Sequence, residues 1–158
     1  MKLLVMSDSH ENIDRMRYAA GQTKPDAILH LGDHISDAQK LSRQLPKTKV
    51  YMVKGNCDFR GKEENELFLT LGGVKILMVH GHTYGVKSGL AALIERSRLL
   101  GADIALYGHT HRAALNQENG LWLMCPGQME RHDADLLASY GIVTIEDGNI
   151  VCGIEMLP

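Results

Sequence analysis

The sequence predicts an α/β fold in which two β-sheets pack face to face, with helices on their outer sides. The first half of the chain alternates short apolar segments with helical patterns, whereas the second half is mostly paired strands around tight turns. The chain has 158 residues, of which 44% are hydrophobic, so it can bury one sizeable core. We therefore expect a single domain over residues 1–158.

Three apolar strands are expected first, each followed by polar residues. These strands are Lys2–Met6, Ala27–Leu31 and Val50–Val53. Continuous apolar runs of this length are typical of parallel strands that are buried on both faces. Helices are expected over 12–21 and 37–45, and Gly21 and Pro46 are the residues expected to end them.

The remaining chain predicts three hairpins, because pairs of apolar segments flank Gly72-Gly73, Asn119-Gly120 and Asp147-Gly148. Their strands are expected at Leu67–Leu71, Val74–Val79, Arg112–Asn116, Leu121–Cys125, Tyr140–Glu146 and Asn149–Met156. A helix over 88–100, with Ser88 as its cap and Gly101 as its stop, and a strand at Asp103–Tyr107 separate the first two hairpins. Residues 128–139 are expected to form a loop or a short helix.

Candidate ligand residues follow five of these strands. They are Asp8, His10, Asp33, Asn56, His80, His82, His109 and His111. Each motif alone has a simpler explanation, such as helix capping at Asp8 or a turn at Asn56. In His109-Thr110-His111, extended backbone would point both imidazoles the same way. Because ligands bind at the carboxyl ends of strands in α/β sheets, the fivefold recurrence predicts loops that meet around metal.

The donor types indicate which metals the site would take. Carboxylate, imidazole and amide groups suit manganese, iron, zinc or cobalt better than calcium. Eight candidates are too many for one ion but suit two ions that share a carboxylate. Two such ions can hold the attacking and the leaving oxygen of a phosphoryl group during in-line displacement. The sequence contains neither a G-x-x-x-x-G-K loop nor a G-x-G-x-x-G fingerprint, which argues against nucleotide-binding folds.

Composition limits the expected partners and compartment. A net charge of −2 and a pI near 6.4 argue against a nucleic-acid polymer as substrate. No apolar run approaches the roughly 18 residues of a membrane span. The three cysteines lack a C-x-x-C pair, which favours a reducing compartment and hence the cytoplasm.

Several other polar residues have two interpretations. His30 is expected to be a core histidine, or one that lies beside the site without binding metal. His34 is either an exposed loop residue or a substrate contact. Asp37 could cap the following helix or orient a ligand histidine. Arg131 is either a solvated loop residue or a phosphate contact.

Five motifs, taken together and in this order, resemble a known family. They are Asp8-Ser9-His10, Gly32-Asp33, Gly55-Asn56-Cys57-Asp58, His80-Gly81-His82 and Gly108-His109-Thr110-His111. The chain is identified as similar to the calcineurin-like metallophosphoesterase superfamily and to its small prokaryotic phosphodiesterase branch. It also resembles the retromer metallophosphoesterase-like subunit. The resemblance implies a four-layer, metallo-dependent phosphatase-like sandwich with a di-metal centre at one edge.

The resemblance also implies a role for each matched residue. One metal would be bound by Asp8, His10 and His111, the other by Asn56, His80 and His109, and Asp33 would bridge both. The ions would be divalent transition metals, with Mn²⁺ expected first and Zn²⁺, Fe²⁺, Ni²⁺ or Co²⁺ as alternatives. A metal-bridging hydroxide would attack a small phosphoester in line. The residues expected at the reaction itself are Asp33, Asn56, His82 and Cys57, and His82 would lie near the metals without being a regular ligand.

One position departs from the family pattern. Many members have histidine at the position of Cys57, and that histidine is thought to help the leaving group. The expected function is therefore phosphodiester hydrolysis, with weak turnover of poor leaving groups. The alternative is a catalytically weak or inactive scaffold for protein–protein binding, and a nuclease would fit the chemistry but not the charge. A homo-oligomer is compatible with the sequence.

Overall fold

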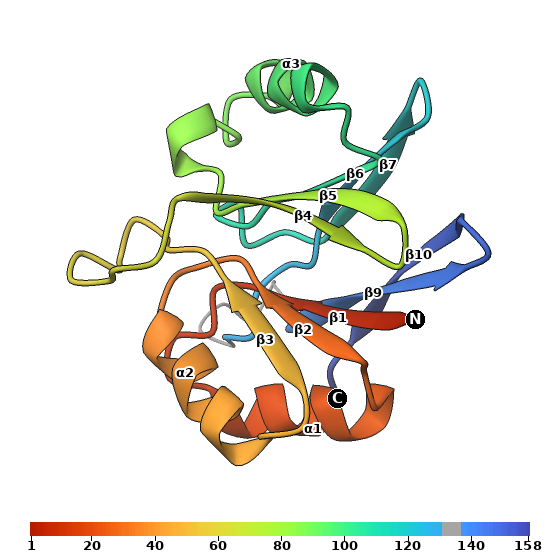
Figure 1. Cartoon of the computed structure of the whole chain (residues 1–158). Helices are drawn as coiled ribbons and strands as arrows, with labels where there is room; N and C mark the ends of the chain where they lie inside the picture. The colour runs from red at the N-terminus through yellow and green to blue at the C-terminus, as the bar shows by residue number, and fades with distance from the viewer. Residues whose placement is uncertain (131–136) are drawn as a thin grey trace.

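The computed structural model describes residues 1–130 and 137–158, and in it two five-stranded sheets pack face to face (Figure 1). Helices α1 (Ile13–Thr23) and α2 (Ile35–Gln44) cover the outer face of one sheet. Helix α3 (Ala91–Leu100) and the 3₁₀ helix η1 (His82–Tyr84) lie on the outer side of the other. The predicted four-layer α/β sandwich is confirmed.

The first sheet has the strand order β10-β9-β1-β2-β3. Its strands are β1 (Lys2–Met6), β2 (Ala27–His30), β3 (Lys49–Met52), β9 (Ser139–Glu146) and β10 (Asn149–Met156). Strands β1, β2 and β3 are parallel, and β9 pairs antiparallel with both β1 and β10. The loops that follow β1, β2 and β3 therefore leave the sheet side by side at one edge.

The second sheet has the order β4-β5-β6-β8-β7. Its strands are β4 (Glu66–Leu71), β5 (Val74–Val79), β6 (Ile104–Leu106), β7 (Ala114–Glu118) and β8 (Leu121–Cys125). Strands β5, β6 and β8 are parallel, and β4 and β7 pair antiparallel at the two sides. The parallel pairing of β5 with β6 places the ends of these two strands next to each other.

The core consists of three apolar layers, and β1 shows how one strand serves two of them. Leu3 and Val5 pack between the sheets, whereas Leu4 and Met6 pack against α1 and α2. Because successive side chains of a strand point to opposite faces, both sets are fully buried. Each fully buried leucine contributes about 2 kcal/mol of transfer free energy, which explains why this strand is apolar throughout. The third layer lies between the second sheet and α3.

Local turn chemistry is confirmed in the three hairpins. Gly72 and Gly73 both have positive φ, of 57° and 81°. The Asn119-Gly120 and Asp147-Gly148 pairs also have positive φ at both positions. Two left-handed residues in a two-residue turn match the right-handed twist of the flanking strands.

Three helix ends differ from the prediction by two or three residues, and one of them is the start of α2, which begins at Ile35 rather than Asp37. Helix α1 continues past Gly21 to Thr23, and Lys24 is its left-handed C-cap, with φ of 46° and its N–H bonded to the Ala20 carbonyl. Helix α3 begins at Ala91 rather than near Ser88, and no side chain caps it. The expected stop at Gly101 is correct, since this residue has φ of 67°.

The first strand of the second hairpin, β7, begins at Ala114, two residues later than expected. Part of the 128–139 segment, including Arg131, lies outside the described residues. None of the described helices is long and apolar enough to cross a membrane.

Candidate metal centre

The five loops that carry candidate ligands meet at one edge of the sandwich. Asp8 and His10 follow β1, and the loops after β2, β3, β5 and β6 supply the other candidates. Backbone hydrogen bonds join neighbouring loops, because the Asp8 N–H donates to the Gly32 carbonyl at 3.0 Å and the Gly108 N–H to the His80 carbonyl at 2.8 Å. Both sheets therefore contribute to one site.

A first group of donors consists of Asp8, His10, Asp33 and His111. One ligand atom from each of the four lies within 4.8 Å of the other three. The Asp8 Oδ1 and His111 Nε2 atoms are 3.1 Å apart. The His10 Nε2 atom is buried and has no hydrogen-bond partner among the described residues. A buried nitrogen with no protein partner beside two carboxylates suits a bound cation.

A second group forms around His80. The Nε2 atom of His80 lies 3.0 Å from Asn56 Oδ1 and 3.5 Å from Asp33 Oδ2, and its ring centroid lies 5.0 Å from that of His109. The Nδ1 atom of His80 lies 2.8 Å from the Leu31 carbonyl, which can only accept, so Nδ1 carries a proton. In the neutral ring this leaves the lone pair on Nε2, which could bind a cation placed between His80, Asn56 and Asp33.

The carboxylates and imidazoles shift each other's pKa. Burial of His80 disfavours its charged form, but the Asp33 and Asp8 carboxylates outweigh burial and raise its pKa. Burial would also raise the pKa of Asp33, yet His80 and the Cys57 amide lower it. Asp8 behaves in the same way, because its bond with His111 lowers its pKa against burial. Both carboxylates are therefore ionised near neutral pH and present negative charge to a cation.

Two glycines make room for these carboxylates. A Cβ atom added at Gly55 would lie 2.1 Å from Asp33 Oδ1, and one at Gly108 would lie 2.0 Å from Ser7 Oγ and 2.9 Å from Asp8 Oδ2. Any side chain at either position would displace a carboxylate or its support. The glycines of these two motifs are thus required by close approach to the aspartates.

The backbone at the site corrects one prediction. His109 and His111 were expected in extended backbone with parallel side chains, but their φ angles are 69° and 61°. The chain turns sharply after β6, and the Thr110 N–H donates to the Gly108 carbonyl at 2.8 Å. As a result His109 approaches His80, whereas His111 pairs with Asp8. The left-handed region costs free energy for residues other than glycine and is concentrated at functional sites.

His82 and Cys57 lie at the side of the second group. The His82 ring centroid is 5.4 Å from that of His80 and 6.2 Å from that of His109, and burial, followed by the His80 charge, lowers its pKa. Cys57 is exposed, and its backbone N–H donates to Asp33 Oδ1 at 2.9 Å. Partial desolvation, followed by the Asp33 charge, raises the pKa of the Cys57 thiol to about 11.

The structure shows the contacts of three residues that had two interpretations, and all three lie near the first group. His30 is fully buried, with Nε2 3.2 Å from Ser9 Oγ, as expected for a core histidine. Asp37 does not cap α2. Instead its Oδ2 accepts from Ser9 Oγ and the Glu11 N–H, each at 2.8 Å, and so holds the loop that carries His10. His34 is half-buried, with its ring centroid 4.7 Å from that of His10.

Some supporting residues were missed by sequence reasoning. Ser7 Oγ donates to Asp8 Oδ2 at 2.5 Å, and Glu130 Oε2 lies 3.9 Å from His10 Nδ1. Asp37 was not missed, because orienting a ligand histidine was one of its two expected roles, and its carboxylate shares the buried face of α2 with Ala38 and Leu41. A charged residue on the apolar face of a helix needs a buried partner. Ser7 and Glu130 had no comparable signal.

The fold and this donor set together define a metalloprotein of the two-sheet α/β sandwich class. The chain belongs to the calcineurin-like phosphoesterase superfamily, whose domain model matches residues 1–148. A probable metallophosphoesterase of Bacillus subtilis, YsnB, is 35% identical over 150 residues, covering 93% of this chain and 86% of that protein. The Escherichia coli phosphodiesterase YfcE is 24% identical over an alignment that covers all of both chains.

Solved structures agree on the fold. A predicted phosphoesterase from Streptococcus pneumoniae has a TM-score of 0.82 and 27% identity, covering 98% of this chain and 88% of that one. Zinc-bound Vps29 of Entamoeba histolytica has a TM-score of 0.76 at 22% identity, covering 99% of each chain. At that identity, the likeness to Vps29 is one of fold.

Proposed function

We propose that this protein is a metal-dependent phosphoesterase that hydrolyses phosphodiesters. The observation that carries the proposal is the division of the donor atoms into two groups that share Asp33. Its carboxylate lies within 4.8 Å of the donors of the first group and 3.5 Å from the central imidazole of the second. One shared carboxylate between two sets of nitrogen and oxygen donors suits a pair of transition-metal ions.

The proposed ligand set follows this division. One ion would be held by Asp8, His10 and His111, the other by Asn56, His80 and His109, and Asp33 would contact both. Mn²⁺ is the ion we expect first, and Zn²⁺, Fe²⁺, Ni²⁺ and Co²⁺ suit the same donors. Two bound divalent ions would supply an activated water and neutralise charge on the phosphoryl oxygens.

The protein's own groups would hold the proposed ligands and contact the substrate. The Leu31 carbonyl holds the His80 ring, and the Cys57 amide holds one Asp33 oxygen, so these donors are preorganised. His82 lies beside the second donor group, with its ring centroid 5.4 Å from that of His80, and we propose that it contacts a phosphoryl oxygen or an ester oxygen. Cys57 remains a neutral thiol near pH 7 and would not act as a nucleophile.

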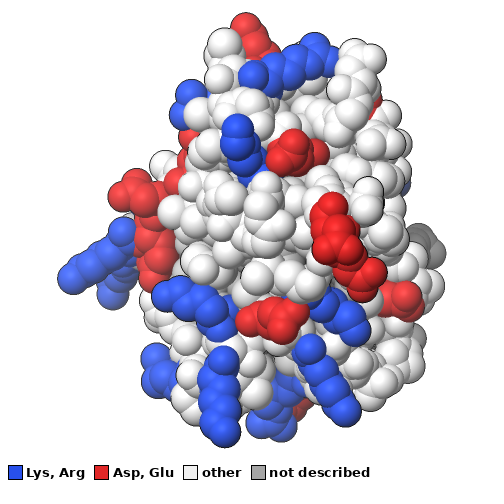
Figure 2. All heavy atoms as spheres, turned by 45° about the vertical axis from the view of Figure 1, so that its right-hand side comes forward, with Lys and Arg blue, Asp and Glu red and all other residues white. Residues whose placement is uncertain are grey.

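The choice of small diesters rests on the relatives and on surface charge. YfcE, which aligns over the whole chain, is named a phosphodiesterase. The net charge of the chain is −2, and Figure 2 shows that the face which includes the right-hand side of Figure 1, away from the metal-centre loops, carries both acidic and basic side chains. A polymer of phosphates would be attracted by a continuous basic surface, so a small phosphoester is the substrate that fits better.

A scaffold function is the second candidate, and the fold shared with Vps29 is the observation that favours it. In that case metal binding would have no catalytic purpose, and phosphoester hydrolysis would be negligible with every metal. The complete set of seven donors favours the enzyme, since a scaffold has no need to keep Asp33 buried and charged among histidines.

Metal content and turnover of the Asp33→Asn and His10→Ala variants test the proposal. We expect the wild type to bind two ions and to hydrolyse bis(p-nitrophenyl) phosphate. Asp33→Asn should impair both sites, because the shared carboxylate loses its charge, whereas His10→Ala should weaken mainly one. Elemental analysis of dialysed protein gives the stoichiometry. One ion or none at saturating metal, with full activity, would refute the two-metal proposal.

A further inference from the structure

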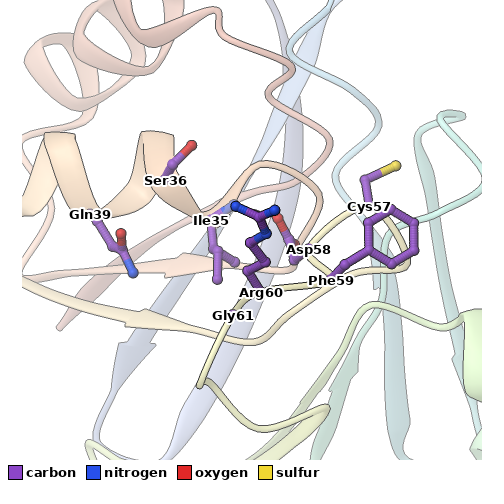
Figure 3. Close-up of a pocket in the computed structure, with 8 residues that line it drawn as sticks. All are labelled: Ile35, Ser36, Gln39, Cys57, Asp58, Phe59, Arg60 and Gly61. Atoms are coloured by element: carbon purple, nitrogen blue, oxygen red, sulfur yellow. The ribbon is translucent and has the colours of Figure 1, made fainter.

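A pocket of about 430 Å³ opens beside the candidate metal centre, between the first turn of α2 and the loop after β3 (Figure 3). Its two walls continue the loops that carry proposed ligands, since Ile35 comes two residues after Asp33 and Cys57 directly follows Asn56. The Cys57 amide also touches Asp33 at 2.9 Å. A group in this pocket would therefore lie beside a phosphate held at the metal centre.

Asp58 joins the two walls of the pocket. Its Oδ1 accepts from the Ile35 N–H at 3.0 Å, and its Oδ2 accepts from the Gly55 N–H at 2.8 Å. Both carboxylate oxygens are thus occupied by backbone, so Asp58 builds the pocket instead of presenting a free negative charge to an anionic ligand. The pocket is preformed, and its volume lies in the roughly 300–1,000 Å³ range of small-molecule sites.

The lining of the pocket is aromatic and apolar on one side. The Phe59 side chain is 91% exposed, which is unusual for a phenyl ring, and Ile35 lines the pocket beside it. A Cβ atom at Gly61 would come within 2.6 Å of Ile35 Cδ1, so glycine keeps this space open. An exposed ring beside an open apolar surface is a platform on which a planar group can stack.

Polar groups complete the pocket. Figure 3 shows the Arg60 side chain between Gln39 and Phe59 in this view. Arg60 forms no ion pair or hydrogen bond with the part of the chain that the structure describes, so its guanidinium is available to a phosphate or to the face of a planar ring. The Gln39 Nε2 donates to Glu63 at 2.8 Å, which leaves its oxygen as an acceptor.

We propose that this pocket binds one ester group of the phosphodiester and selects a planar aromatic group with polar edge atoms, of the nucleobase class. We call it the aryl subsite, and it consists of Ile35, Gln39, Cys57, Phe59, Arg60 and Gly61. The inference rests on the proposed phosphodiesterase function and names the substrate class. An aliphatic ester group could not stack on the Phe59 ring face and is expected to bind more weakly.

Calorimetry on the Mn²⁺-loaded protein tests the subsite without turnover. Thymidine 5′-monophosphate and methyl phosphate are the probes, since they differ only in the group that would enter the pocket. The wild type should bind the nucleotide more tightly than methyl phosphate. Phe59→Ala should weaken nucleotide binding about tenfold, as expected for loss of base stacking. Tyr18→Ala removes a half-exposed ring on α1, remote from the subsite, and should bind the nucleotide as the wild type does.

Turnover separates this inference from the function on which it rests. Two p-nitrophenyl diesters with thymidine or methyl as the second ester group have the same leaving group. Phe59→Ala should lower the ratio of their kcat/KM values about tenfold toward one. Active enzyme with equal nucleotide binding in wild type and Phe59→Ala would overturn the subsite alone. Phe59-dependent nucleotide binding without hydrolysis of either diester would overturn the proposed function and leave the subsite in place.

Discussion

At the scale of single residues, Cys57 limits the chemistry that we expect of this centre. A departing alkoxide develops negative charge, and a positioned acid that protonates it typically contributes about 10²–10⁴-fold. With its pKa raised to about 11, the Cys57 thiol is a poor proton donor near neutral pH. Histidine, whose ordinary pKa is about 6.5, could carry that proton.

We therefore expect rates to fall steeply as the leaving group becomes more basic, with nitrophenyl esters cleaved well and alkyl esters poorly. Cys57→Ala should cost little on nitrophenyl esters, and Cys57→His should help alkyl esters more than activated ones. The measurement is a plot of log rate against leaving-group pKa for the three proteins. A flat plot for the wild type would show that another group protonates the leaving oxygen.

His30 couples stability to pH. Burial lowers its pKa to about 4, whereas the unfolded residue titrates near 6.5. Between these values the unfolded chain binds the additional proton, so stability falls as the pH falls from 7 to 5. This one group should cost about 2 kcal/mol over that range. The free energy of unfolding of metal-free wild type and His30→Gln can be measured with urea at pH 7 and pH 5. Between these pH values the wild type should lose about 2 kcal/mol more than His30→Gln, and equal losses would contradict the assignment.

At the scale of elements, a polar network fixes η1, the short helix that begins at His82. The Tyr84 hydroxyl donates to Glu66 on β4, and Arg96 on α3 donates to the same carboxylate through Nη2 at 2.6 Å and Nε at 3.2 Å. Glu66 is only partly buried, and Arg96 lowers its pKa, so this carboxylate is charged at neutral pH. The network joins three elements and holds η1 beside the second donor group.

Glu66→Gln should loosen η1, because the neutral amide retains a bond with Tyr84 but loses the ion pair with Arg96. We expect faster backbone amide exchange over 82–86 and lower kcat with little change in bound metal. Glu118→Gln is the matched control. It removes the exposed ion pair of 2.8 Å between Glu118 and Arg98, which lies on α3 as Arg96 does, and it leaves the contacts of η1 intact. Equal exchange over 82–86 in both variants would show that packing alone holds η1.

Elements whose cause is local were predictable from the sequence. The three hairpin turns were, because two residues with positive φ require glycine or a residue such as asparagine or aspartate. The end of α1 was not, because Lys24 takes the left-handed cap position three residues after the glycine that the rule favours. The start of α3 likewise depends on how η1 and its following turn pack, which the Ser88 signal could not reveal.

The candidate site was predictable as a set of strand ends but not as a geometry. Parallel strands deliver their following residues to a common edge, which placed Asp8, Asp33 and Asn56 together. The separation of His109 from His111 depends on left-handed backbone, which is unfavourable for histidine and is stabilised only by the assembled loops. The aryl subsite combines residues of α2 with residues of the loop after β3, so no local sequence pattern could predict it.

At the scale of the whole molecule, the three apolar layers are independent of the donor residues. We therefore expect the fold to survive chelation, unlike that of a zinc finger. Chelator should abolish turnover and leave far-ultraviolet circular dichroism nearly intact. At about 100 times Kd, one bound ion adds about 2.7 kcal/mol, so the Tm should fall by roughly 5–10 °C when it is removed. A random-coil spectrum after chelation would contradict this view.

The origin of the donors in both sheets has a consequence for the timing of folding. Asp8, Asp33 and Asn56 come from the first sheet, and the histidines at 80, 109 and 111 come from the second. Until the two sheets dock, the chain holds no complete set of ligands, so an ion cannot guide the early steps. In stopped-flow experiments, added Mn²⁺ should leave the refolding rate almost unchanged but should lower the unfolding rate. The ions would then bind after the two sheets have docked and stabilise a sandwich that assembles without them.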